Sequence, residues 1–226
     1  MAKINSINNK AQDLTIDPGA SGDSFLQFNI NDVAEFKIGV DDSDSDKFKI
    51  SQGSDLAANT TFVMTANGER TMPLQPAFLA VAGTENNATG DSTFHDIGSI
   101  TATTEIYDQG SNFTPGDGAG TGALFTAPIS GRYLLSFSVT TRIDSSTGGD
   151  DQYTRITTSN RTYFAYTLPT RNQASGFYGI DGDISWVATV LADMDASDTC
   201  IFYVVSRGGS KVDDIIRGYL SGVLMV

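Results

Sequence analysis

Hydrophobic and polar residues alternate in several short segments of the chain, and this pattern predicts β-strands. When every second residue is apolar, one face of a strand packs on a core while the other meets solvent. In one of these segments, residues 186–191, both faces are partly apolar, as in a sandwich core. Gly, Ser, Thr, Asn and Asp interrupt the chain too often for a helical repeat. The sequence therefore predicts an all-β sandwich or barrel. The other alternating segments are residues 26–30, 34–40 and 47–50.

A boundary near residues 68–73 divides the chain into two regions. Before it, the predicted strands are short and their apolar residues lie on one face only. A segment of that size has little core of its own, so its apolar stripe needs a partner. The same stripe on two symmetry mates supplies one, as in the β-prisms of trimeric fibre proteins. We therefore predict a trimeric, β-prism-like shaft or attachment region at residues 1–73 and a head at residues 74–226.

Residues 122–138 carry the most informative motif, GALFTAPISGRYLLSFS. A short predicted strand is followed by a Pro and a Gly, and a second predicted strand then begins with Tyr133. The motif resembles the signature of C1q/TNF-like jelly-roll domains. Four further landmarks stand in the family's order, and the resemblance covers about residues 74–226. It implies a jelly-roll head that forms a homotrimer and binds partners. The landmarks are residues 76–80 (PAFLA), 106–113 (IYDQGSNF), 173–176 (QASG) and 218–226 (GYLSGVLMV).

Residues 36–51 contain two alternating strands around an acidic turn, which predicts a β-hairpin. Together with residues 61–73, this hairpin resembles shaft segments of tailed-bacteriophage fibre proteins. The resemblance implies a virion location and a trimeric fibre or spike. Its shaft would attach to other virion proteins, and its head would bind a host-surface polysaccharide. Two alternatives stay open: a capsid decoration or head-fibre protein without a dedicated receptor, and a polysaccharide depolymerase.

The charge balance excludes several classes of partner. The 226 residues include 27 acidic and 14 basic ones, for a formal net charge of -13. Because no basic stripe is visible, we expect no nucleic-acid binding. No apolar run is long enough to span a bilayer and the first ten residues lack an apolar signal region, so we expect neither membrane insertion nor a signal peptide.

The single cysteine, Cys200, excludes an internal disulfide and is expected to be a small buried apolar residue.

Two acidic clusters invite a calcium interpretation. Asp42, Asp44 and Asp46 have the spacing of a calcium loop, but Lys47 and Gly53 stand where an EF-hand needs Gly and Glu. We interpret this cluster, and a second one at residues 193–198, as solvated turns. Some C1q-like heads bind calcium near the trimer axis, and the resemblance places those ligand positions at Thr167 and Asn172, which are not acidic. We therefore predict no metal and no other cofactor.

Catalysis has little support in the sequence. His95 is the only histidine, so a nucleophile–histidine pair has one possible base. We interpret it as a surface or locally hydrogen-bonded residue, and no phosphate-binding loop is complete. We therefore expect a protein that is not an enzyme.

Aromatic residues gather between positions 150 and 180, where sugar rings could stack on them. Most are expected to fill the core or the trimer interface. The exceptions are expected in loops, which can vary on a rigid β scaffold. We predict that Arg171, Asn172 and Tyr178 bind the glycan, and that the loop at residues 144–151 is a second candidate. The aromatic set is Tyr153, Tyr163, Phe164, Tyr166, Phe177 and Tyr178.

Overall fold

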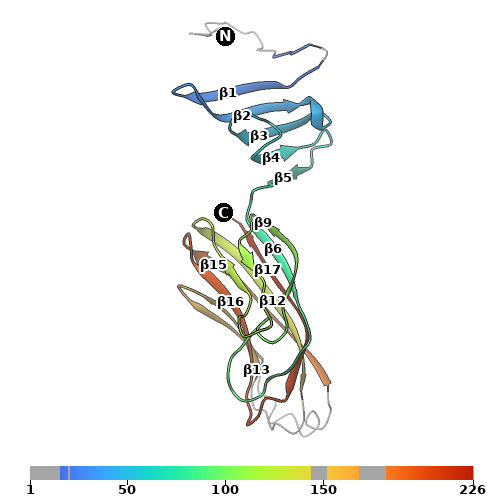
Figure 1. Ribbon diagram of the computed structural model, residues 1–226, viewed down its shortest axis with the longest axis vertical. Coiled ribbons are helices and arrows are strands. Elements are labelled where there is room, and N and C mark those ends of the chain that lie inside the picture. The colour runs from blue at the N-terminus through green and yellow to red at the C-terminus, as the bar shows by residue number, and fades with distance from the viewer. Residues whose placement is uncertain (1–15, 20, 144–151, 168–181, 226) are drawn as a thin grey trace. The chain divides into compact units, whose positions relative to one another are not determined.

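The computed structural model describes residues 16–19, 21–143, 152–167 and 182–225 (Figure 1). The chain divides into two compact units, Met1–Leu74 and Gln75–Val226. Every strand pair in the described residues is antiparallel, and their one helical segment is the 3₁₀ turn Asp42–Asp44. The predicted all-β class is therefore confirmed. In the part of the chain that the structure describes, no helix is long and apolar enough to cross a membrane.

The N-terminal unit is a single five-stranded antiparallel sheet in which neighbours in sequence are neighbours in space. A two-residue loop, Asn31 and Asp32, joins the first two strands with positive φ at both positions, as a type I′ hairpin turn requires. The second and third strands pair as the hairpin that the alternation predicted. In order across the sheet, the strands are β1 (Ser24–Ile30), β2 (Val33–Asp41), β3 (Lys47–Gln52), β4 (Thr60–Met64) and β5 (Arg70–Thr71).

Gly39 lets β1 lie close against β2. A Cβ atom at this position would stand 2.1 Å from the backbone oxygen of Ser24 and 2.7 Å from Cα of Phe25. Because both contacts are with the backbone of β1, a larger residue would push that strand away. The close approach brings the Phe25 ring beside β2, where the Lys37 ammonium lies 3.7 Å from the ring centroid.

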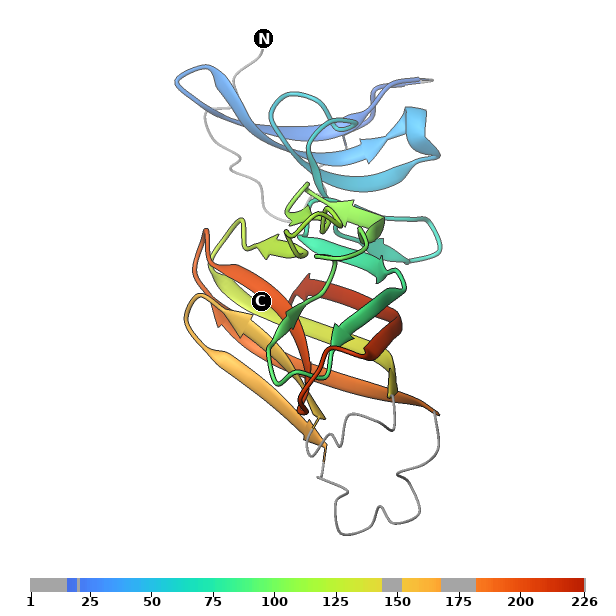
Figure 2. The ribbon, with the colours of Figure 1, turned by 60° about the horizontal axis from the view of Figure 1, so that its bottom comes forward.

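The C-terminal unit is a sandwich of two six-stranded sheets (Figures 1 and 2). Strands far apart in sequence lie side by side, as in a jelly roll. The first sheet has the order β15-β12-β17-β6-β9, with β7 beside β17: β15 (Gly182–Met194), β12 (Gly131–Ile143), β17 (Asp213–Leu224), β6 (Ala77–Ala82), β9 (Thr104–Gln109) and β7 (Glu85–Thr89). The second has the order β10-β11-β16-β13-β14, with β8 beside β16: β10 (Phe113–Thr114), β11 (Leu124–Thr126), β16 (Thr199–Ser206), β13 (Gln152–Thr158), β14 (Thr162–Thr167) and β8 (His95–Asp96).

The motif at residues 122–138 connects the two sheets. Its first strand, β11, pairs with β16, whereas its second strand, β12, pairs with β15 and β17. Tyr133 is fully buried at the start of β12, and its hydroxyl donates a hydrogen bond of 2.8 Å to the carbonyl of Ile129. The Pro128–Gly131 turn is thereby fixed to the strand that follows it. The closing segment of the chain forms β17, which lies between β12 and β6 in the middle of its sheet.

Aromatic rings fill the space between the two sheets. Phe78 on β6 stacks on Phe113 and Phe125, with ring centroids 4.6 and 4.9 Å apart, and meets Phe202 edge-on at 6.3 Å. These four rings come from both sheets, so they tie the layers together. Trp186 on β15 also faces this core, and its indole nitrogen donates a hydrogen bond to Thr141. Cys200 is fully buried there, as expected, and burial raises the pKa of its thiol.

Candidate interaction surfaces

One face of the N-terminal sheet is apolar from β1 to β4. The register places Leu26, Ile38, Ile50 and Phe62 opposite one another in a single row across four strands. Parallel rows above and below it are also mostly apolar, and no charged residue occupies this face on β1 to β4. Phe28 is 56% exposed at its edge. We call this surface the apolar shaft face: Leu26, Phe28, Phe36, Ile38, Val40, Phe48, Ile50, Phe62 and Met64.

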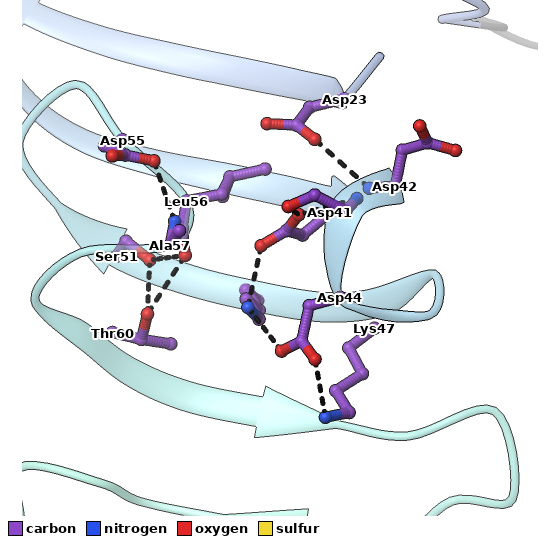
Figure 3. Close-up of polar contacts among 12 residues, drawn as sticks. Asp23, Asp41, Asp42, Asp44, Lys47, Ser51, Asp55, Leu56, Ala57 and Thr60 are labelled. Carbon is purple, nitrogen blue, oxygen red and sulfur yellow. Dashed lines mark hydrogen bonds and ion pairs between the residues drawn. The ribbon is translucent and has the colours of Figure 1, made fainter. Parts of the chain in front are cut away.

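The opposite face of the same sheet is covered over β2 and β3 by the unit's own turns (Figure 3). Leu56, in the loop between β3 and β4, is fully buried, and its carbonyl accepts hydrogen bonds from the hydroxyls of Ser51 and Thr60. Close to it, the Lys49 ammonium lies 2.7 Å from carboxylate oxygens of both Asp41 and Asp44. Over β2 and β3 this face is therefore closed by loops and ion pairs within the chain, although Phe25 and Gln27 on β1 stay exposed on it. The apolar shaft face has no such cover.

Lysine side chains form ion pairs with carboxylates of the acidic turn that has the spacing of a calcium loop. The hydrogen bond from Lys49 is the largest cause that lowers the pKa of Asp41, and bonds from Lys47 and then Lys49 lower the pKa of Asp44 to about 2. These carboxylates stay ionised and paired well into the acid range. Across the described ranges, no three His, Cys, Asp or Glu side chains are grouped so that they could hold a metal ion.

The outer face of the β15-β12-β17-β6-β9 sheet is a second exposed apolar surface. Both faces of residues 186–191 are partly apolar, and each face has a different surrounding. Trp186 and Ala188 face the core, whereas Val187 and Leu191 point outward and are more than half exposed. Leu191 pairs with Leu134, and Tyr219 lies across from Ser138, which pairs with Val187. Hydroxyls lie between these apolar groups, as in the 3.0 Å contact of Ser136 with Thr189. This surface belongs to the C-terminal unit.

The outer face of the other sheet carries an arginine between aromatic rings. The register aligns Phe164, Arg155, Tyr203 and Asp96 in one row across β14, β13, β16 and β8. The Arg155 guanidinium carbon lies 3.6 Å from the ring centroid of Phe94 and 4.2 Å from that of Tyr203. We call this group the arginine–aromatic row; it consists of Phe94, Asp96, Arg155, Phe164 and Tyr203.

Two further residues extend the row. Tyr153 meets Phe94 and Phe164 edge-on, with centroids 5.5 and 5.9 Å apart. The exposed Arg207 has its guanidinium carbon 5.8 Å from the Tyr153 ring. The sequence had placed most aromatics of this region in the core or an interface. Tyr163 does pack against the core, but Phe164 lies on the outer surface and is 45% exposed.

His95 is buried rather than at the surface. Its Nε2 lies 2.7 Å from Oε2 of Glu85, and the two side chains are 4% and 0% exposed. Glu85 also accepts backbone hydrogen bonds from Gly98 and Ile100. The pair therefore fixes the segment after β8 against β7, and solvent does not reach it. The interpretation of His95 as a surface residue is wrong, and the alternative of a hydrogen-bonded histidine fits.

Asp96, the next residue, is an ionisable group in an unfavourable position. Its Oδ1 is buried without a hydrogen-bond partner in the described residues, and it packs where a side chain at Gly122 would otherwise stand. Burial is the largest cause that raises the pKa of Asp96 to about 6, and the charge of Glu85 adds to it. His95 and Arg155 oppose this shift without cancelling it. The ionised carboxylate thus destabilises the fold at neutral pH.

Replacing Asp96 with Asn should stabilise the protein at pH 8 by about 1 kcal/mol, since a shift of one pKa unit is worth about 1.4 kcal/mol and partial exposure reduces the effect. The folded pKa lies above the ordinary value of 3.8, so the wild-type protein gains stability as pH falls from about 6 toward 4. The advantage of Asn should therefore vanish at pH 4. Chemical denaturation at both pH values measures it.

Asp117→Asn is the matched control for that change. Asp117 accepts backbone hydrogen bonds from Ala119 and Thr121, which lower its pKa. This replacement should destabilise the protein at pH 8, opposite in sign to Asp96→Asn. A wild-type protein that is at least as stable as Asp96→Asn at pH 8 would contradict the burial argument.

The glycan site predicted from sequence lies outside the described residues. This applies to Arg171, Asn172 and Tyr178 and also to the loop at residues 144–151. The arginine–aromatic row was missed because its members are distant in sequence. Its one local signal is the Tyr153-x-Arg155 spacing, which places both side chains on the same face of a strand.

Comparisons with known proteins give likenesses of fold at low identity. No protein-family model matches the chain, and no curated protein matches it either. Among solved structures, the globular domain of zebrafish complement 1qA aligns with a TM-score of 0.44 and 14% identity, over 67% of this chain and 98% of that one. PRD1 vertex protein P5 gives 0.43 and 9%, over 68% and 99%. Murine APRIL gives 0.41 and 12%, over 67% and 99%. These scores identify neither a family nor a function.

Proposed function

We propose that this chain is a homotrimeric structural protein of a bacteriophage particle, a fibre or spike. Its N-terminal unit attaches to other virion proteins, and its head binds a host-surface polysaccharide. The observation that carries the proposal is the apolar shaft face, an apolar surface that crosses β1 to β4 on a sheet whose other face is closed over β2 and β3 by the chain's own loops and ion pairs. The exposed apolar residues of a monomer are normally scattered singly, whereas these residues form one contiguous apolar surface.

Copies of the same chain are the partner that this face fits best. Each chain carries a net charge of -13, so copies repel one another except through an uncharged surface. A closed ring of three sheets would remove all three faces from water at once. The number three follows from the resemblance of the head to C1q/TNF-like domains and of the N-terminal segments to fibre shafts. The exposed outer face of β15, β12 and β17 gives the head a surface of its own for the same association.

A binding role fits the head better than catalysis. The one histidine is buried against Glu85, where no substrate can reach it. Binding through three identical heads also needs no tight single site, because linked weak sites raise the overall avidity. We therefore propose an adhesin that acts by multivalent attachment and does not cleave its receptor.

Competition for adsorption tests this function. The purified chain, added to host cells in excess, should block adsorption of the phage, and the polysaccharide should keep its chain length. Adsorption that is unchanged at every concentration of the chain would contradict the adhesin role and favour a capsid decoration protein. Shortened polysaccharide would instead identify a depolymerase.

A further inference from the structure

We propose that the arginine–aromatic row, together with Arg207, binds an anionic polysaccharide. This inference rests on the proposed function of the head as an adhesin, and it names the surface and the ligand class. The row lies on the outer face of the β10-β11-β16-β13-β14 sheet and not in the loops to which the sequence pointed.

The guanidinium of Arg155 is held ready to bind an anion at its edge. The ring centroids of Phe94 and Tyr203 lie 3.6 and 4.2 Å from its central carbon. Such contacts hold the planar guanidinium in one orientation and keep its faces poorly hydrated, which favours bidentate binding of a carboxylate or phosphate at its edge. Nε is the only Arg155 nitrogen that is buried without a partner in the described residues, so each terminal nitrogen is either bonded or reaches the surface.

An exposed ring beside this cation supplies a surface for sugars. Phe164 pairs directly with Arg155 across β13 and β14, and its ring is 45% exposed. Tyr153 supports that ring from the side at a centroid distance of 5.9 Å. An apolar face of a sugar ring can stack on Phe164 while a substituent of the same residue reaches the arginine edge.

The local charge selects an anionic ligand. Arg155 and Arg207 lie on one face of a chain whose net charge is -13, and Asp96, at the far end of the row, is the acidic member of the group. Acidic polysaccharides carry single charges spaced by whole sugar rings, which suits two cations with rings between them. Nucleic acid carries its charges at a closer spacing, so a chain of net charge -13 repels it more strongly than it repels a sparsely charged polysaccharide.

Binding of purified full-length chain to immobilised polygalacturonate and to hyaluronate tests the proposal, with dextran as the neutral comparison. The wild-type protein should bind at least one anionic polymer, bind dextran at least tenfold more weakly, and lose binding as salt rises. The double variant Phe164→Ala with Arg207→Gln should weaken binding at least tenfold. Both residues are exposed, so the head should keep its melting temperature within a few degrees.

Arg161→Gln is the matched control, because Arg161 is an exposed arginine in the turn between β13 and β14, outside the arginine–aromatic row. It should leave binding within twofold of wild type. Binding to neither anionic polymer, equal binding to dextran, equal binding to single-stranded DNA, or a double variant that binds like wild type would each overturn the proposal. Adsorption to host cells is measured separately: if the wild-type chain blocks phage adsorption and the double variant does so equally well, the adhesin stands and this site is wrong.

Discussion

Replacing Ile38 with Asp should open the contact that we propose between the N-terminal sheets of three copies of the chain. Ile38 lies in the central row of the apolar shaft face, between Leu26 and Ile50. In a closed trimer, the change buries three like charges without partners. Each costs several kcal/mol, so association through this face should weaken by at least about a thousandfold.

Hydrogen exchange and dye binding are the right measurements for this change. The exposed face should bind a dye such as ANS, and amides of β2, β3 and β4 should exchange faster, even if the heads keep the chains together. Gln27→Asp is the control, because Gln27 is exposed on the adjacent position of β1 and faces the other way. If Ile38→Asp binds no more dye than Gln27→Asp and exchanges at the same rate, the face is not an interface.

Phe78→Ala should be the most destabilising single truncation in the head. Phe78 is fully buried and touches rings from three strands of the opposite sheet. Removing a buried Phe side chain costs about 3–5 kcal/mol when the surroundings cannot collapse. Strands from both sheets surround this position, and β17 approaches so closely that a Cβ at Gly222 would stand 2.5 Å from the ring.

Thermal and chemical unfolding of the head would measure that loss. Ile106→Ala, on the exposed side of β9, removes a similar apolar group from a surface position and should change stability by less than about 0.5 kcal/mol. Equal losses for Phe78→Ala and Ile106→Ala would contradict the assignment of the core.

The parts of the fold that the sequence predicted are those that local patterns encode. The hairpin of β2 and β3 follows from alternation on both sides of one turn, and the two strands of the residue 122–138 motif follow from a Pro and a Gly between apolar runs. Alternation also predicted that one face of the N-terminal sheet is apolar. It could not predict that the other face is closed by Leu56 and by Lys49 with its two carboxylates, since those contacts depend on how loops fold back.

The arginine–aromatic row depends on long-range register, which a single sequence does not reveal. Arg155 meets Tyr203 because β13 pairs with β16, and Asp96 joins them because β8 pairs with the same strand. The bond between Glu85 and His95 likewise joins separate strands, β7 and β8. A shift of one residue in any of these pairings would turn the side chains to opposite faces. The alternation within one strand does not show which strand pairs with it or in which register. It therefore could not have identified the arginine–aromatic row.

Thiol labelling of the assembled protein tests the central claim, burial of the apolar shaft face between copies, most directly. The one native cysteine, Cys200, is fully buried, so a cysteine introduced at the surface becomes the reactive thiol. Leu26 and Gln27 are adjacent on β1, face opposite sides of the sheet and are both exposed in the single chain. The account predicts that a bulky maleimide labels Gln27→Cys rapidly and Leu26→Cys at least tenfold more slowly, in a particle with three times the 24.0 kDa chain mass. Equal labelling of the two positions, or a particle with the mass of one chain, would contradict it.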